Sequence, residues 1–538
     1  MSELYERIRF RGQPVAHPNA IVTRGNARFT VLTPRLIRLE WSETGVFEDR
    51  CTYAFPTRYT DSPPAFTTCE DNGALMIDTG ALTLRYPPFV ESAGGFTAGN
   101  LSITFRLNGE PVTWTPGMAN PQNLRGTRRT LDECEGDAAL DEGLLSRAGW
   151  ALFDDSKNVI FDDDGWVGPR PEFALQDWYF FGYGHDYKAA LAEYTCFGGD
   201  IPLIPRYILG GWWSRYWAYS EQDLRDLVAE FEEHNVPLDV FVIDMDWHTP
   251  DGWTGYTWNR ELFPDPPAFL AWLHKKGLRV TLNLHPADGV HPHEEVYPQF
   301  AKALGIDPKS GDPVPFRIAD KNYVRHYFEI IHHPMEDAGD GGVDFWWMDW
   351  QQGEISEVKG LDPLPWINHL HFNDIKRKGV RPMLYSRWGG LGNHRYYIGF
   401  SGDSYVVWTA LQFQPYLTAT AANVAYGWWS HDIGGHMGGA TDPELYARWV
   451  QFGALSPVLR LHATKDPRTE RRPWAYPEPY GTAAMDAFRW RYRLIPYLYT
   501  MARVTSDARL ALCRPMYYES PEADDAYVAR SSTISATR

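Results

Sequence analysis

The 538-residue sequence lacks long apolar runs and a cysteine framework. No apolar segment approaches the roughly 18 to 20 residues that a membrane helix needs. The charged first segment, MSELYERIRFRGQPVAHPNA, also lacks the apolar centre of a signal peptide. The five cysteines are scattered and include no CxxC pair, which argues against disulfides and against a zinc site. These absences predict a cytoplasmic protein with reduced thiols and no membrane partner.

An excess of positive charge is missing as well. The chain has 51 basic and 69 acidic residues, which gives a formal net charge of −18. A negative surface repels phosphate backbones unless a local basic stripe is present. The best basic stretch, RGTRRT at 125–130, is short and is followed at once by LDECEGD. We therefore predict no nucleic-acid partner.

The pattern of the chain changes near residue 200. From about 20 to 190 it shows short alternating segments separated by Gly, Pro, Asn and Asp, which is typical of an antiparallel sandwich. From about 206 to 462 eight strand-like segments follow, most of them with helical patterns between them: YILGGWWSRYW, LDVFVIDMDW, LRVTLNLHP, VDFWWMDW, VRPMLYSR, RYYIGFSGD, ANVAYGWWSHDIGG and LSPVLRLH. This alternation predicts a parallel (β/α)8 barrel within an α/β fold. A doubly wound open sheet is the alternative, although no GxGxxG follows the first strand.

These patterns predict three regions. Residues 1–200 form an N-terminal β-sandwich domain, 201–508 form the barrel, and 509–538 begin a C-terminal β region. Ser220 is the expected N-cap of the first barrel helix.

Polar residues end seven of the eight predicted strands. They are Asp244 and Asp246, His285, Asp349, Arg387, Asp403, His431 and Asp432, and Arg460 and His462. One aspartate at a strand end usually caps a helix or makes an Asx-turn. Seven such ends face one mouth of a barrel, which is where barrels present their chemistry.

These side chains allow three chemistries. A metal site is disfavoured because HExxH is absent, and the metal-like clusters HPHEE (291–295) and HH (332–333) lie outside the strand ends. A Ser-His-Asp triad is possible on composition, but no GxSxG elbow appears. Two carboxylates acting on a sugar remain, and the 23 tryptophans suit stacking on sugar rings.

Five motifs resemble those of glycoside hydrolase family 31, the retaining α-glycosidases that include α-glucosidases and α-xylosidases. They are PLDVFVIDMDW, GGVDFWWMDW, LYSRWGGLGNHRYYIGFSGDS, WWSHDIGGHMGG and RWVQFGALSPVLRLH. In the third motif an Arg precedes the Gly-Asp aspartate by sixteen positions, as Arg387 precedes Asp403. NLRGTRRTLDECEG resembles part of the family's N-terminal sandwich, with a loop that reaches the active site.

The resemblance implies Asp349 as the nucleophile and Asp403 as the general acid/base of a retaining, exo-acting α-glycoside hydrolase. It implies no metal or organic cofactor and a small oligosaccharide or α-glycoside as substrate; it says nothing of oligomeric state. The predicted sugar-binding residues are Asp244, Arg387, Asp432, His462, Trp347 and Gln352.

Two segments depart from the family pattern. After the nucleophile, α-glucosidases of the family usually continue Met-Asn-Glu, whereas this chain continues WQQGE from 350 to 354. We expect first an α-glucosidase. The alternative substrates are an α-N-acetylgalactosaminide, an α-galactoside, an α-xyloside and a glycoside of an acidic sugar. The pattern is lost after ADDAYVAR, near the point where the family carries further β-domains. The sequence is therefore also compatible with a truncated product, and with an inactive carbohydrate-binding remnant.

Overall fold

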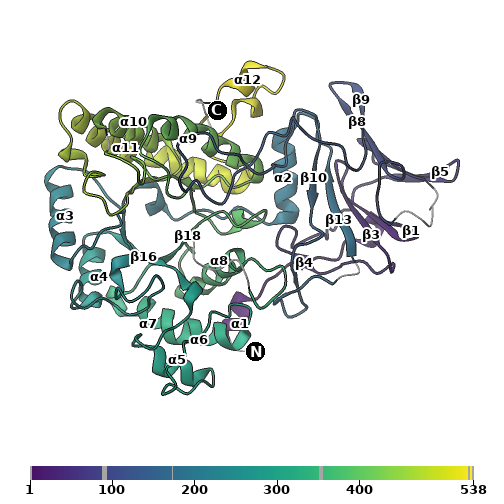
Figure 1. Ribbon diagram of the computed structural model, residues 1–538. Helices are drawn as coiled ribbons and strands as arrows, with labels where there is room; N and C mark the ends of the chain where they lie inside the picture. The colour runs from purple at the N-terminus through teal and green to yellow at the C-terminus, as the bar shows by residue number, and fades with distance from the viewer. Residues whose placement is uncertain are drawn as a thin grey trace.

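Two five-stranded antiparallel sheets form the sandwich, which lies to the right of the barrel in Figure 1. The computed structural model describes residues 3–87, 94–171, 174–349, 356–440, 442–530 and 534–535. The first sheet comprises, in spatial order, β1 (Ile21–Arg24), β2 (Ala27–Thr33), β3 (Leu36–Ser42), β13 (Ala174–Phe181) and β10 (Ala151–Asp154). The second comprises β5 (Thr67–Asp71), β6 (Ala74–Asp78), β7 (Leu82–Tyr86), β8 (Ser102–Leu107) and β9 (Glu110–Trp114).

The two sheets share one apolar core. Alternate residues of facing strands meet in it, among them Phe29, Leu39, Ile77, Leu84 and Phe180. The apolar side chains follow the period of two that the alternating sequence pattern predicts, and the sandwich is confirmed. A small sheet of β12 (Val167–Gly168), β11 (Ile160–Phe161) and β4 (Cys51–Thr52) belongs to the N-terminal half as well.

Eight parallel strands form the barrel. In chain order they are β14 (Gly211–Trp213), β15 (Val240–Ile243), β16 (Arg279–Leu284), β17 (Phe345–Met348), β18 (Leu384–Ser386), β19 (Gly399–Phe400), β20 (Trp429–Ser430) and β21 (Leu459–Leu461). β14 pairs with both β15 and β21, and a parallel bridge joins Ile433 to Leu461, so the sheet almost closes on itself. Neighbours follow the chain order without reversal. The barrel is therefore confirmed, and the doubly wound sheet is excluded.

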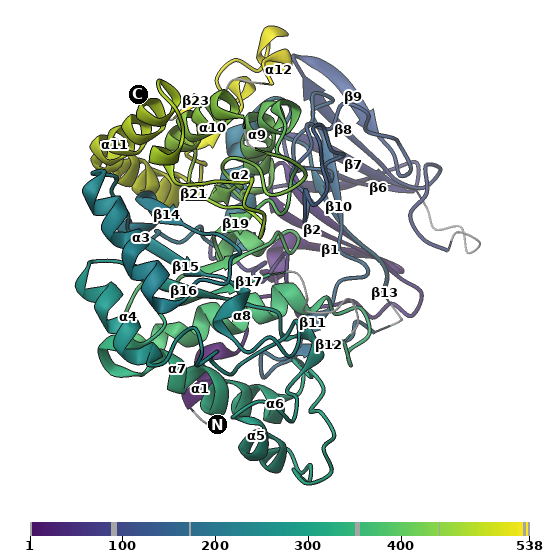
Figure 2. The ribbon, with the colours of Figure 1, turned by 60° about the vertical axis from the view of Figure 1, so that its left-hand side comes forward.

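Helices surround the barrel strands, and Figure 2 shows α3 and α4 on the outer side of β14 to β17. The helices are α1 (Glu3–Ile8), α2 (Tyr187–Gly198), α3 (Glu221–Glu233), α4 (Pro266–Lys275), α5 (Tyr297–Ala303), α6 (Lys321–His326), α7 (His333–Glu336), α8 (Pro363–Asp374), α9 (Trp408–Thr420), α10 (Pro443–Leu455), α11 (Tyr480–Ala508) and α12 (Asp525–Val528). Ser220 caps α3 as predicted, because its side chain accepts from the Asp223 N–H while the Asp223 side chain accepts from Ser220.

Adjacent tryptophans on β17 point to opposite sides of the barrel wall. Trp347 lies against Tyr385, Phe400 and His462 inside the barrel. Trp346 points outward, and its indole N–H donates to Glu336 at the end of α7. The strand is thus buried on both faces, which explains its continuous apolar sequence.

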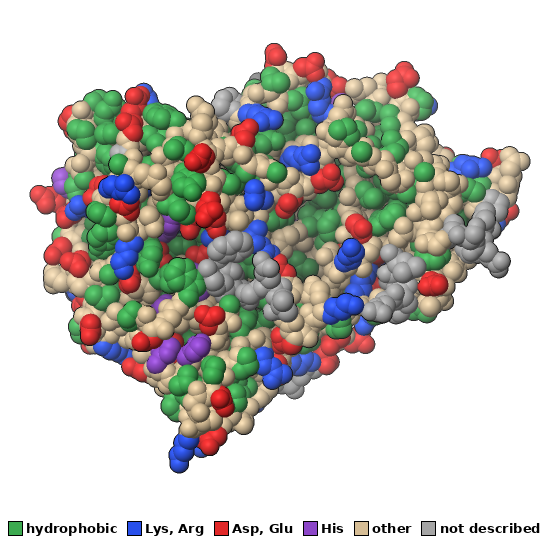
Figure 3. Space-filling model, in the orientation of Figure 1, with side chains coloured by type: hydrophobic (Ala, Val, Ile, Leu, Met, Phe, Trp, Pro, Cys, Tyr) green, Lys and Arg blue, Asp and Glu red, His purple; other side chains and the backbone are tan. Residues whose placement is uncertain are grey.

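The remaining strands, β22 (Cys513–Arg514) and β23 (Ile534–Ser535), pair antiparallel near the end of the chain. Among the described residues, none of the helices is long and apolar enough to cross a bilayer. On the face shown in Figure 3, basic side chains are scattered among acidic ones.

Candidate active site

The predicted polar residues meet at the carboxyl ends of the barrel strands. Each follows its strand by one to three residues: Asp244 after β15, Asp349 after β17, Arg387 after β18, Asp403 after β19, Asp432 after β20 and His462 after β21. Parallel strands bring these ends to one mouth, where hydrogen bonds and ion pairs connect the side chains.

Asp349 is held as a carboxylate by donors on both oxygens. Arg387 Nε and Nη2 each lie 3.0 Å from Oδ1. Asn283 Nδ2 donates to Oδ2 at 3.2 Å, and His285 Nε2 lies 3.5 Å from the same oxygen. Burial alone would raise the pKa of Asp349, but the Arg387 charge and these donors hold it far below its usual range. The group is therefore ionised at every physiological pH.

Arg387 also connects the barrel to a loop of the N-terminal half. Its Nη1 donates to Thr130 Oγ1 at 2.6 Å and to Asp132 Oδ1 at 3.0 Å. The same Asp132 oxygen accepts from the backbone N–H of Asp403 at 2.7 Å. Two backbone hydrogen bonds, Leu131 N to Ser401 O and Glu133 N to Asp403 O, fasten the loop to the end of β19. The expectation that a loop of the sandwich region reaches the site is confirmed.

Asp403 lies in the opposite electrostatic environment. Its carboxyl has no arginine partner among the described residues, and His436 Nδ1 lies 3.5 Å from Oδ1. Burial raises the pKa of Asp403 to about 7, and the negative charges of Asp432 and Asp349 add to that shift while His436 opposes it. At neutral pH a large fraction of Asp403 therefore carries a proton.

Asp432 is paired with Arg460 and His436. Arg460 Nη2 contacts Oδ1, and His436 Nδ1 lies 3.0 Å from Oδ2. Burial would raise the pKa of Asp432, yet the Arg460 charge keeps it below its usual range. His436 thus lies between a permanent carboxylate and the carboxyl of Asp403.

His462 and Asp244 form the other side of the mouth. Ser214 Oγ hydrogen-bonds to His462 Nδ1 at 2.7 Å, and His462 Nε2 lies 3.9 Å from Asp244 Oδ2. Burial keeps the pKa of His462 well below 6.5 and raises that of Asp244 to about 7. The ring of Trp347 lies 5.4 Å from that of His462 at a steep angle, and its indole N–H has no partner in the described part of the chain.

Sequence reasoning missed four contributors to this network. Asn283, on β16, lies inside a strand pattern and gives no sequence signal. Thr130 and Asp132 lie more than 250 residues from the arginine that they contact. His436 could have been found, because it directly follows the Asp-Ile-Gly-Gly element that the sequence analysis singled out. The predicted Gln352 lies outside the described residues.

Three side chains of this site have the composition of a metal site. One ligand atom each from Asp432, His436 and His462 lies within 4.8 Å of the other two. However, Asp432 already contacts Arg460 through one oxygen and His436 through the other. Two of the three prospective ligands are thus already hydrogen-bonded to each other, so these residues suit hydrogen bonding to hydroxyl groups.

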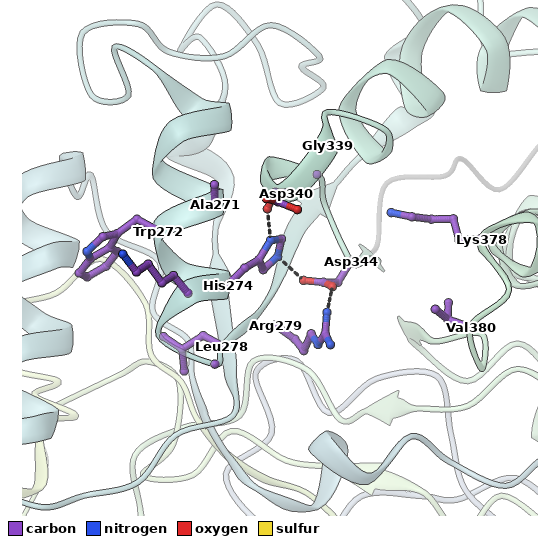
Figure 4. Close-up of a pocket in the computed structure, with 13 residues that line it drawn as sticks. Ala271, Trp272, His274, Leu278, Arg279, Gly339, Asp340, Asp344, Lys378 and Val380 are labelled. Atoms are coloured by element: carbon purple, nitrogen blue, oxygen red, sulfur yellow. Dashed lines mark hydrogen bonds and ion pairs between the residues drawn. The ribbon is translucent and has the colours of Figure 1, made fainter.

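A cavity of about 800 Å³ lies at the opposite end of the barrel (Figure 4). Its His274 bonds to Asp344 Oδ2 at 2.8 Å and to the Asp340 carbonyl, and Arg279 pairs with Asp344 Oδ1 at 2.9 Å. Arg279 begins β16 and Asp344 precedes β17, so this is the amino-terminal face of the barrel. Charged side chains that pair at that face of a barrel usually serve its stability rather than its catalysis.

The barrel matches a known family. The family described as Glycosyl hydrolases family 31 TIM-barrel domain matches residues 201–501. The chain belongs to glycosyl hydrolase family 31. This confirms the resemblance seen in the sequence.

Two relatives illustrate what the chain is similar to. Alpha-glucosidase 2 of Bacillus thermoamyloliquefaciens is 28% identical over 388 residues, which cover 65% of this chain and 48% of that protein. The alpha-xylosidase of Saccharolobus solfataricus is 25% identical over 380 residues, which cover 65% and 50%. The chain thus spans about half the length of these relatives.

Solved family 31 structures share the fold. The dextranase of Flavobacterium johnsoniae, in complex with glucose, superposes with a TM-score of 0.75 at 17% identity and covers 96% of this chain and 72% of its own. An alpha-xylosidase from a soil metagenome, in complex with xylose, has a TM-score of 0.74 at 17% identity and covers 96% and 89%. Both the sandwich and the barrel therefore have counterparts in the family.

Proposed function

We propose that the chain hydrolyses α-glycosides from the end of an oligosaccharide by double displacement, with Asp349 as nucleophile and Asp403 as general acid/base. The observation that carries this proposal is the contrast between the two carboxyl groups. Asp349 is clamped by Arg387 and stays ionised, whereas Asp403 has no such clamp and a pKa near 7. Two carboxyl groups whose surroundings separate their pKa values are the requirement for one nucleophile and one acid.

In the first step Asp349 attacks the anomeric carbon. Arg387 holds Oδ1 with two N–H groups, whereas Oδ2 has the Asn283 amide at 3.2 Å and His285 Nε2 at 3.5 Å but no arginine contact. Oδ2 is therefore the more weakly bound oxygen and the one better suited to attack. Asp403 gives its proton to the departing glycosidic oxygen, and a covalent glycosyl-aspartate forms.

In the second step Asp403 acts as a base. The ester bond neutralises Asp349, and the repulsion by which its charge raised the pKa of Asp403 disappears. The pKa of Asp403 then falls, so the carboxylate that has just lost its proton can take one from water. Water attacks the anomeric carbon, the C–O bond to Asp349 breaks, and the product keeps its configuration.

The surrounding residues suit a single terminal sugar. Asp244, Asp432 and His462 offer acceptors and donors for hydroxyl groups, and Trp347 supplies an aromatic wall beneath them. The relatives are named for glucose- and xylose-releasing activities, which makes α-glucosides and α-xylosides the first substrates to test. Gln352, next to the nucleophile in the sequence, is proposed to contribute to the choice of sugar.

The test is activity on a panel of aryl α-glycosides: glucoside, xyloside, galactoside and N-acetylgalactosaminide. Asp349→Ala should abolish turnover of the best substrate. The matched control is Asp344→Ala, because Asp344 lies at the other end of the same strand and outside the network. Equal loss of activity in both variants, at equal melting temperature, would exclude the nucleophile assignment.

Asp403→Ala provides an independent check. The variant should lose activity on substrates with poor leaving groups and recover turnover with azide, which needs no general base, to give a glycosyl azide of retained configuration. Sugar binding without turnover in the unmodified chain would instead favour a carbohydrate-binding remnant.

A further inference from the structure

A second group of chemically capable side chains lies outside the barrel wall. His332, Glu336 and His371 are 0%, 2% and 4% exposed, and one ligand atom of each lies within 4.8 Å of the other two. His332 ends the π-helical segment Tyr327–His332, Glu336 ends α7, and His371 belongs to α8. Trp346 separates the group from the active site, because it points outward from β17 while Trp347 points inward.

His332 is the unusual member. It is fully buried, and neither ring nitrogen has a hydrogen-bond partner among the described residues. Buried polar atoms are rarely left unpaired in folded proteins, and each such case calls for an explanation. The segment that it ends is π-helical, a geometry that occurs frequently at functional sites. A bound ion would satisfy one of the two ring nitrogens, since the lone pair of a neutral imidazole can coordinate it.

The two imidazoles of the group lie against each other. The two ring centroids lie 4.7 Å apart at 85°, so the rings meet edge to face.

Glu336 is oriented like a ligating carboxylate. Trp346 Nε1 donates to Oε1 at 2.7 Å, and Arg377 Nη2 contacts Oε2 at 2.6 Å. Carboxylates that bind metals are commonly fixed by such outer hydrogen bonds and keep further lone pairs for the ion. Residues four apart on a helical segment project to the same side, which brings Glu336 and His332 together.

The charges around the group balance. Glu336, Asp337 and Asp374 face the two arginines Arg377 and Arg7, through ion pairs of 2.6 to 3.5 Å. Lys378 Nζ donates to the Glu336 carbonyl at 2.8 Å and is a third positive group, so three negative and three permanent positive charges balance. A divalent ion would therefore not enter a positively charged environment.

We propose that His332, Glu336 and His371 bind one divalent transition-metal ion, zinc in the first instance, as a structural site that ties α7 to α8 behind β17. Two imidazoles and a carboxylate suit zinc, and a water would complete a tetrahedron. Ligand atoms around tetrahedral zinc lie about 3.4 Å apart, so the side chains draw together by up to about 1.4 Å.

The first experiment measures metal content on the full chain. Protein stripped with dipicolinate, reloaded with zinc sulfate and gel-filtered should hold about one zinc per chain and melt at a higher temperature than the stripped protein. Wild-type protein that binds no zinc, cobalt or nickel, with an unchanged melting temperature, overturns the proposal.

The variant His332→Phe separates a metal ligand from a merely buried ring. Tyr327, Phe328 and Trp346 surround the position, so phenylalanine keeps the packing while removing both nitrogens. The variant should lose the zinc and the zinc-dependent rise in melting temperature, and its stripped form should melt no lower than stripped wild type. Glu336→Gln should lose zinc as well and serves if His332→Phe does not fold.

The matched control is His369→Phe, on the same helix as His371. His369 is equally buried, but Tyr396 and the Ile8 carbonyl occupy both of its nitrogens. This variant should melt lower and keep its zinc. Retention of zinc by His332→Phe would contradict the proposed ligand. Loss of zinc only when the solvent-facing His291 and His293 are changed to alanine would show that the ion binds elsewhere.

Discussion

The raised pKa of Asp403 predicts how activity depends on pH and on the leaving group. Only the protonated form can act as the acid, and with a pKa of about 7 roughly one molecule in eleven is protonated at pH 8 and one in a hundred at pH 9. For an aryl glycoside with a poor leaving group, kcat/KM should be level below about pH 6 and fall tenfold per pH unit above about pH 7. Asp349, whose pKa is held far below its usual range, contributes no acidic limb between pH 5 and 9.

A substrate pair turns this into a decisive assay. The 2,4-dinitrophenolate of a 2,4-dinitrophenyl glycoside departs without being protonated, so kcat/KM for this substrate should stay level through pH 9. For the corresponding phenyl glycoside, kcat/KM should show the whole decrease above about pH 7. Asp403→Ala should flatten the phenyl profile at a low value and leave the dinitrophenyl kcat/KM close to that of wild type. Basic limbs of equal slope for both substrates would show that another group titrates, and the acid assignment would be wrong.

Three further changes probe the network and the core. Arg387→Met removes the charge that keeps Asp349 ionised, so kcat should fall on the order of 10²-fold and an acidic limb should enter the pH–rate profile; an unchanged profile would contradict the clamp. His436→Phe removes a group that lowers the pKa of Asp403, so that pKa should rise and the decrease of kcat/KM should begin at higher pH. A decrease that begins at lower pH would contradict this role of His436. Phe180→Ala, in the sandwich core beside Trp114 at 5.0 Å, should reduce the free energy of unfolding in urea by about 3–5 kcal/mol; a loss below about 1 kcal/mol would mean that the core refills the cavity.

The sequence was sufficient for the architecture because hydrophobic periodicity is a local property. Each barrel strand is a short apolar run closed by a polar residue, and parallel pairing then brings those ends together whatever separates them in the chain. Asp349, Arg387 and Asp403 could be placed at one mouth on that basis alone. Adjacent strand residues point to opposite faces, so the two tryptophans of β17 must diverge, and only which of them faces the barrel interior depends on strand tilt and on the helices outside.

The sequence could not predict contacts between residues that lie far apart in the chain and meet only in the folded structure. Asn283 contacts Asp349 from inside an ordinary strand pattern, and Asp132, although it lies in the segment whose resemblance implied a loop at the active site, gives no sign of the arginine that it contacts. The His332 group was set aside because two adjacent histidines outside the strand ends carry little information. His371, from another helix, gives them a common environment.

The Asp132 loop has a consequence for how the molecule can be altered. One carboxylate oxygen of Asp132 accepts both from the arginine that keeps the nucleophile charged and from the backbone of the acid. A barrel transplanted without its sandwich would retain every strand-end residue and still lack a common anchor for its two reacting groups. In chimeras made between relatives, the Asp132 loop and the barrel should therefore come from the same parent. Chimeras that take the loop from one parent and the barrel from the other should lose activity.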